Sequence, residues 1–145
     1  MISINIKNTK KLINAVEMYG KEALKEVGEV TKFTAQEIEN TAKMLAPVDK
    51  SQLKASIKSE MQEDNLHYKI TAYQPYSAYQ EFGTGGKVVI NEDWSEMASQ
   101  FKGAGIREVN LTPQPFMFPA YVKGRAEYNK SLRDLFKELA KRFNK

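Results

Sequence analysis

The chain has 145 residues, no cysteine and a formal net charge of +4. A chain of this length fits one domain that buries a core without staples, and the lack of cysteine excludes disulfides and zinc–thiolate sites. No apolar stretch approaches the roughly 20 residues that span a membrane, and the first residues lack the basic and apolar regions of a signal peptide. We therefore expect one domain over residues 1–145, with no membrane partner.

A long amphipathic helix is the first extended element that the sequence predicts. Apolar residues step by three or four from about residue 10 to residue 45 and form one stripe: Leu12, Val16, Tyr19, Ala23, Val27, Val30, Thr34, Ile38, Ala42 and Leu45. The helix would measure roughly 50 Å at 1.5 Å per residue, which exceeds the width of a compact domain of this size. We expect either a kink at Gly20 or Gly28 or an end that packs on an oligomeric partner. Pro47 would stop the helix.

Three short stretches predict an antiparallel sheet. Isoleucines alternate with polar residues over residues 2–6, which is the pattern of a half-buried strand. Residues 56–63 and 66–73 are predicted to form two strands joined by a tight turn, with Ile57 and Ile70 facing inward. This hairpin would lie at the centre of a small, mostly antiparallel sheet on which a long N-terminal helix and a C-terminal helix pack. The predicted fold class is α+β.

Two polar features of these elements are interpreted as surface chemistry. His67, the only histidine, has no acidic or cysteine partner at ligand spacing, so we interpret it as a surface residue. Glu39 and Lys43 form an i,i+4 pair in the favourable order, worth a few tenths of a kcal/mol on a solvated helix face. Neither feature predicts a site.

Residues 75–86 contain an aromatic cluster followed by glycines. Tyr76, Tyr79 and Phe82 recur every three residues, so one helical turn would bring their rings to one side. The glycines that follow break regular structure and allow positive φ. The pattern predicts a rigid anchor for one end of a mobile segment.

The segment from about residue 83 to residue 112 is predicted to be that mobile loop. It is poorly periodic, and structureless loops of this length are uncommon in compact domains unless they are functional. Trp94 would serve equally well as an anchor in a partner pocket or as a side chain folded back onto the core. The residues of this segment that we select as assembly and interface candidates are Gly83, Thr84, Gly85, Gly86, Trp94 and Phe101.

The prolines between Pro113 and Pro119 predict an extended segment that lays Phe116 and Phe118 into the core. Pro119 would then open a final helix, because proline is favoured in the first helical turn. The apolar face of that helix consists of Tyr128, Leu132, Leu135, Phe136, Leu139 and Phe143, and the opposite side forms a basic stripe of Lys130, Arg133, Lys137 and Lys141. From Lys123 onward the chain has eight basic and three acidic residues, so the basic character of the protein belongs to this helix.

No combination of residues predicts catalysis. Residues 83–87 resemble a phosphate-binding loop only superficially, because Glu81 stands where that motif needs glycine and Val88 where it needs serine or threonine. We expect no enzymatic activity, no cofactor, no metal site and no small-molecule substrate.

Three blocks in order resemble a family of small tailed-phage and prophage proteins. They lie within residues 46–57, 75–85 and 113–120. The residues that carry the resemblance are Pro47, Asp49, Tyr76, Tyr79, Glu81, Phe82, Pro115, Phe116 and Pro119. Together the blocks resemble the tail-completion or neck proteins of the HK97 type, which are related to the minor tail protein Z group. The chain departs from the family pattern at residues 50–51, where Thr-Gly is usual, and at Phe118, where a basic residue is usual.

The resemblance implies a non-enzymatic virion protein, made in the bacterial host cytoplasm, that acts at the junction of head and tail. It implies that copies complete the tail or neck by assembling as a ring, and the sixfold tail tube points to a hexamer. Other head–tail connector proteins and tail-terminator proteins would be the partners. The basic stripe would face DNA in the channel, an acidic partner ring, or solvent alone.

Two other classes of function compete with this interpretation. A small nucleic-acid-binding protein would use the basic C-terminal helix and stack aromatic rings on bases, and its DNA affinity would depend on salt. A small enzyme would use a carboxylate such as Glu81, and it would show a raised carboxyl pKa in a cleft.

Overall fold

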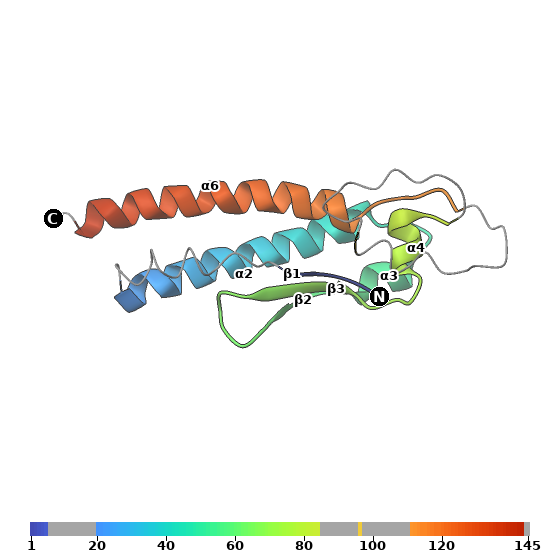
Figure 1. The fold of residues 1–145 in the computed structure, drawn as a ribbon, viewed down its shortest axis with the longest axis horizontal. Helices are drawn as coiled ribbons and strands as arrows, with labels where there is room; N and C mark the ends of the chain where they lie inside the picture. Colours follow the sequence, from blue (N-terminus) through green and yellow to red (C-terminus); the bar gives the residue numbers. More distant parts are fainter. Residues whose placement is uncertain (6–19, 85–95, 97–110, 144–145) are drawn as a thin grey trace.

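The computed structural model describes residues 1–5, 20–84, 96 and 111–143 (Figure 1). The elements are β1 (Ile2–Asn5), α2 (Gly20–Leu45), α3 (Ser51–Ser56), β2 (Ile57–Met61), β3 (Tyr68–Ala72), α4 (Ser77–Phe82) and α6 (Met117–Phe143). The long helices α2 and α6 run side by side in opposite directions, and the sheet lies along another side of α2 (Figure 1). The predicted α+β class is confirmed.

The sheet has β3 at its centre, with β1 and β2 paired antiparallel on either side of it. The register places Ala72 opposite both Ile2 and Ile57, and it places Ile4 opposite Ile70. All five side chains are buried, so they form the face that packs against α2. The predicted hairpin and its inward isoleucines are confirmed, although both strands are shorter than predicted.

The buried face of α2 follows the predicted stripe, with additional small residues between its members. It consists of Ala23, Val27, Gly28, Thr31, Thr34, Ala35, Ile38 and Ala42. The helix ends before Pro47, as predicted, because the residue preceding a proline is disfavoured in helical geometry. The prediction that Leu45 belongs to the buried stripe is wrong, because Leu45 is 46 % exposed and the neighbouring Ala46 is buried instead.

Gly20 begins α2 with a φ of 80°, a left-handed conformation that a regular right-handed helix does not contain. Gly20 is one of the two positions at which the sequence predicted a kink. The other, Gly28, lies inside α2 and packs on the hairpin turn, where an added Cβ would be 3.1 Å from Cβ of Asn65. The predicted helix residues before Gly20, and Ile6 of the first strand, lie outside the described residues.

Helices α2 and α6 approach closely because Gly124 has no side chain. A Cβ placed there would overlap Cγ1 of Ile38 and would lie 2.7 Å from its Cδ1. One turn further along α6, the Tyr128 hydroxyl and the Thr31 hydroxyl share a buried hydrogen bond of 3.0 Å. This close contact and this polar bridge add to the apolar packing between the two helices.

The last helix begins earlier than the sequence predicted. Phe116 is fully buried, as expected, but α6 starts at Met117, so Pro119 lies within its first turn and does not open it. Proline is tolerated there because the first N–H groups of a helix have no intrahelical acceptor. Further along, the apolar residues from Tyr128 to Leu139 are buried or half-buried, as predicted, and all four residues of the basic stripe are exposed.

Candidate functional site

Glu81 occupies the position where the second and third sequence blocks meet. It lies on α4 and is 4 % exposed. Its Oε2 accepts hydrogen bonds from the backbone N–H groups of Phe116 and Met117 at 2.8 and 2.9 Å, and its Oε1 accepts one from Phe118 at 2.8 Å. The first N–H groups of a helix lack intrahelical partners, and the helix dipole favours a negative charge beside them. Glu81 therefore caps α6 across 35 residues of sequence.

The environment of this carboxylate contains two opposing influences. Burial raises the pKa of Glu81 above its ordinary value, because burial penalises the charged form. The three N–H donors stabilise the charged form and act in the opposite direction, but the pKa remains raised. Both oxygens are occupied by backbone donors, so the chemistry of this group is that of a cap.

Flanking hydrogen bonds extend the Glu81 contact on both sides. Gln80 and Gln114 are joined twice, from Gln114 N–H to the Gln80 carbonyl and from Gln80 Nε2 to Gln114 Oε1, each at 2.9 Å. Thr84 and Leu111 are also joined twice, since each donates its backbone N–H to an oxygen of the other at 3.0 Å. We call these two paired segments, residues 80–84 and 111–118, the clasp. The clasp brings together the two described ends of the segment that the sequence predicted to be a loop.

Gly83 is required by the geometry of the clasp. Its φ is 73°, which side-chain-bearing residues rarely adopt. A Cβ at this position would lie 2.6 Å from the carbonyl oxygen of Leu111 and 2.9 Å from Cδ of Pro113. The glycine was selected as a flexible interface residue, and the structure gives it a local packing reason as well.

Helix α4 does not present the predicted aromatic face to the core. Its buried residues are Ser77, Ala78, Gln80 and Glu81. Tyr79 is 45 % exposed, while Tyr76 and Phe82 are half-buried against the core. The prediction of one common ring cluster is therefore wrong, because a six-residue helix turns Ala78 and Glu81 toward the core and leaves Tyr79 on the other side.

The first and second sequence blocks also lie close together. Lys50 closes the turn that begins at Pro47, because its backbone N–H bonds the Pro47 carbonyl at 3.1 Å. Its Nζ lies 5.9 Å from the centroid of the Tyr76 ring. Ser77 donates its hydroxyl to the carbonyl of Ala72 at 3.3 Å, which ties the beginning of α4 to the end of β3. Asp49 is exposed and Pro47 is half-buried.

The sequence predicted that Glu39 only pairs with Lys43 on a solvated helix face, but the structure also gives it contacts with the sheet. Its Oε2 accepts hydrogen bonds from both the backbone N–H and the hydroxyl of Ser59, each at 2.6 Å, while its Oε1 pairs with Lys43. Burial alone would raise the pKa of Glu39, but the bonds from Lys43 and Ser59 outweigh it and lower the pKa. Because Ser59 lies in β2, at one edge of the sheet, Glu39 fastens that edge to α2.

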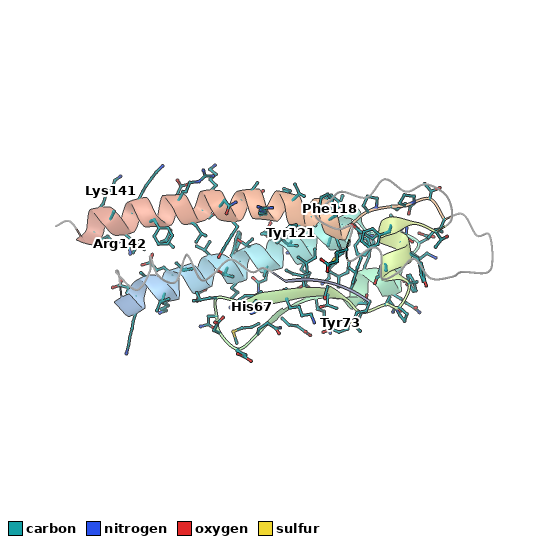
Figure 2. The ribbon with its side chains drawn as sticks, in the orientation of Figure 1. His67, Tyr73, Phe118, Tyr121, Lys141 and Arg142 are labelled. Atoms are coloured by element: carbon teal, nitrogen blue, oxygen red, sulfur yellow. The ribbon has the colours of Figure 1, made fainter. Side chains whose placement is uncertain are left out.

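The interpretation of His67 as a surface residue is also corrected, because the side chain, labelled in Figure 2, is half-buried. It lies just before β3, and its Nε2 is buried without a hydrogen-bond partner among the described residues. The sequence could not show this, because burial of that ring depends on the packing of the hairpin. Among the described residues, no group of three or more His, Cys, Asp or Glu side chains is placed to hold a metal ion.

Several predicted site residues cannot be placed. Gly85, Gly86, Trp94 and Phe101 lie outside the described residues. In the parts of the chain that are described, no helix combines the length and the apolar character needed to cross a bilayer.

The clasp residues that the sequence analysis missed are Gln80, Leu111 and Gln114. One signal for them was present in the sequence: the predicted one-turn helix carries an amide and an acid, Gln80 and Glu81, which could bond the free backbone N–H groups at the start of the final helix. The sequence could not show which residues of the two segments would pair, because no periodicity links residues so far apart.

The comparison with protein families matches residues 10–83 to the family described as "Bacteriophage HK97-gp10, putative tail-component". This is 74 of the 145 residues. The chain belongs to the HK97-gp10-like family. The match includes Glu81 and ends at Gly83, so α6, whose first turn Glu81 caps, lies beyond it. No curated protein and no solved structure matches the chain significantly. Membership in the HK97-gp10-like family supports a structural role in a phage tail.

Proposed function

We propose that this chain is a non-enzymatic virion component that acts at the head–tail junction, where it completes the tail or neck so that filled heads can join it. Copies act as a ring, which contacts other connector proteins and tail-terminator proteins. Family membership supports the phage-tail role, and the junction and the ring are our extension of it.

The observation that supports the proposal is that Glu81 serves as a helix cap. The carboxylate of the strongest sequence block is buried, and both its oxygens hold the first turn of α6. Its raised pKa is also what a catalytic carboxyl would show. A catalytic carboxylate needs an oxygen that can reach a substrate, however, and here the backbone N–H groups occupy both. The block thus maintains architecture, as expected of a protein whose work is assembly.

Deletion of the gene from a phage that encodes this chain tests the proposal. We expect induced or infected cells to contain filled heads and full-length tails that lie separately in electron micrographs, and a plasmid copy to restore joined particles. Normal virions from the deletion strain would overturn the proposal. Heads without any tails would retain the tail role but refute the assignment to the junction.

A further inference from the structure

The basic stripe of α6 forms a straight row of cations. Lys130 and Lys137 are seven residues apart, which is close to two helical turns, and Lys123 continues the row by the same step. All are exposed, and Figure 2 shows Lys141 on the side of α6 that faces away from α2. Among the described residues, Lys137 reaches an acid only at 4.0 Å, from Asp134 on the surface. Three exposed acids, Glu127, Asp134 and Glu138, lie three or four residues from these lysines, so the row is a positive surface that the chain itself partly neutralises.

A row of the opposite sign lies on the exposed face of α2. Glu22, Glu29 and Glu37 are spaced by seven and eight residues, so at 100° per residue they lie within about 80° of one another round the helix. Glu22 and Glu29 are exposed, and Glu37 is half-buried. Phe33 stands between the last two, four residues from each, and is 65 % exposed. We call Glu22, Glu29, Phe33 and Glu37 the acidic stripe.

Other charges on α2 lie beside this stripe or are already used. Lys25 and Lys32 are about 80–100° round the helix from Phe33, so they flank the stripe on one side. Glu26 lies on the same face as the stripe, but it pairs with Arg142 of α6 at 2.5 Å. The net character of the line through Phe33 remains acidic.

The two stripes of one chain lie on different sides of the helix pair. Ile38 marks the side of α2 that faces α6, because it contacts Gly124. Phe33 lies five residues from Ile38, or about 140° round the helix. Phe33 therefore points away from α6. At the beginning of α2 the stripe lies within reach of α6, because Glu26 pairs with Arg142 and Glu22 also acts electrostatically on Arg142. The basic stripe faces away from α2. A second copy of the chain can pair them.

We infer that the basic stripe of one copy docks on the acidic stripe of the next. Extended to Lys123, the basic stripe spans about 27 Å at 1.5 Å per residue, and the acidic stripe from Glu22 to Glu37 spans about 22 Å, so the two are similar in length. Lysine stems can cover the exposed Phe33 ring while their ammonium groups meet the flanking carboxylates. The contact joins two different surfaces, so each added copy exposes a new free stripe until a ring closes. The inference rests on the ring assembly proposed above and names its surfaces.

The test measures the association of the full chain by analytical ultracentrifugation over a concentration series at low and high salt. We expect K130E/K137E and E29K/E37K each to weaken self-association about tenfold or more, and high salt to weaken that of the wild type. The variant with all four changes restores opposite charges across the contact and should recover association. K54E/K58E, which reverses two lysines outside both stripes, is the matched control and should associate like wild type. Circular dichroism and thermal melting confirm that each variant folds.

The outcomes separate this inference from the proposed function. Wild type that assembles, with both double variants assembling equally well, would refute these surfaces and leave the ring intact. Wild type that stays monomeric at every concentration would refute both. Monomers that bind a DNA duplex through Lys130 and Lys137 would assign the basic stripe to nucleic acid and overturn the inference.

Discussion

A single carboxylate replaces three missing helix acceptors in this protein. Glu81 reaches the first turn of α6 from another helix, whereas most N-terminal caps come from the residue next to the helix. The consequence is that a substitution on α4 acts on α6. Loss of the Glu81 carboxylate should therefore lower the stability of both helices together.

The variant E81Q tests this role. One amide oxygen remains to accept a bond, but the amide nitrogen would face buried N–H donors, so at least one of them loses its acceptor. We expect a loss of about 2–4 kcal/mol in the free energy of unfolding, as for buried polar groups left unpaired. Urea denaturation followed by circular dichroism measures it. E63Q, in the exposed hairpin turn, is the control, and a loss below about 1 kcal/mol for E81Q would contradict the capping role.

Glu39 gives a pH dependence of definite sign. Its pKa is lowered in the fold from 4.5, so its charged form is favoured in the folded state. Its contribution to stability is then present above pH 4.5 and is lost as the pH falls through the lower, folded-state pKa. We expect E39Q to be less stable than wild type at pH 7 and the difference to shrink as the pH drops below 4.5. A difference that is constant between pH 7 and pH 3 would show that the bonds to Ser59 and Lys43 do not depend on the charge.

At the scale of elements, the packing of α2 on α6 depends on the lack of a side chain at position 124. Alanine is normally the better helix former, by about 1 kcal/mol over glycine. Here the methyl group of alanine would overlap Ile38. A loss of stability on replacing Gly124 by alanine would therefore indicate a close contact, and a gain would indicate open space.

We expect G124A to destabilise the protein by about 1–3 kcal/mol, as overpacked core positions do. I38A alone should cost about 2–5 kcal/mol. The double variant should cost less than the sum of the two, because the removed atoms are those that the new methyl group meets. A stabilising G124A, or strictly additive effects, would refute the close approach of the helices.

The elements themselves could largely be predicted from the sequence. Period-2 alternation identified the strand around Ile4, turn residues between two strand segments identified the hairpin that contains Ile70, and period-3.6 stripes identified α2 and the apolar face of α6. What failed were positions where a partner distant in sequence decides the outcome. Leu45 was expected to continue the stripe, but the helix ends there. Glu39 and Glu81 were recognised as polar residues, but their acceptor roles depend on a register that no local pattern contains.

At the scale of the whole molecule, the buried residues form two separate clusters. One lies between the sheet, α2 and the first turn of α6, and includes Phe116 and Ile70. The other joins the first half of α2 to the last half of α6, and includes Val27 and Leu139. Among the described residues the second cluster contains no strand residue, and outside the two helices only Leu66 of the hairpin turn packs against it.

Hydrogen exchange can resolve the two clusters. We expect L139A to lower protection mainly in the helical ends around the second cluster, because local opening there need not disturb the sheet. F116A should lower protection throughout, since its ring is fully buried beside the sheet and α6. Equal loss of protection in β3 for both variants would show that the molecule opens as one unit.

The clasp has a consequence for how this chain tolerates changes in length. Its paired ends, Thr84 and Leu111, hold the exit and return points of the intervening segment together by two hydrogen bonds. The entropy of closing such a segment grows only with the logarithm of its length, at about 0.6 kcal/mol for each doubling. If closure entropy alone decides the cost, a short epitope tag inserted between these ends should lower the free energy of unfolding by less than about 1 kcal/mol.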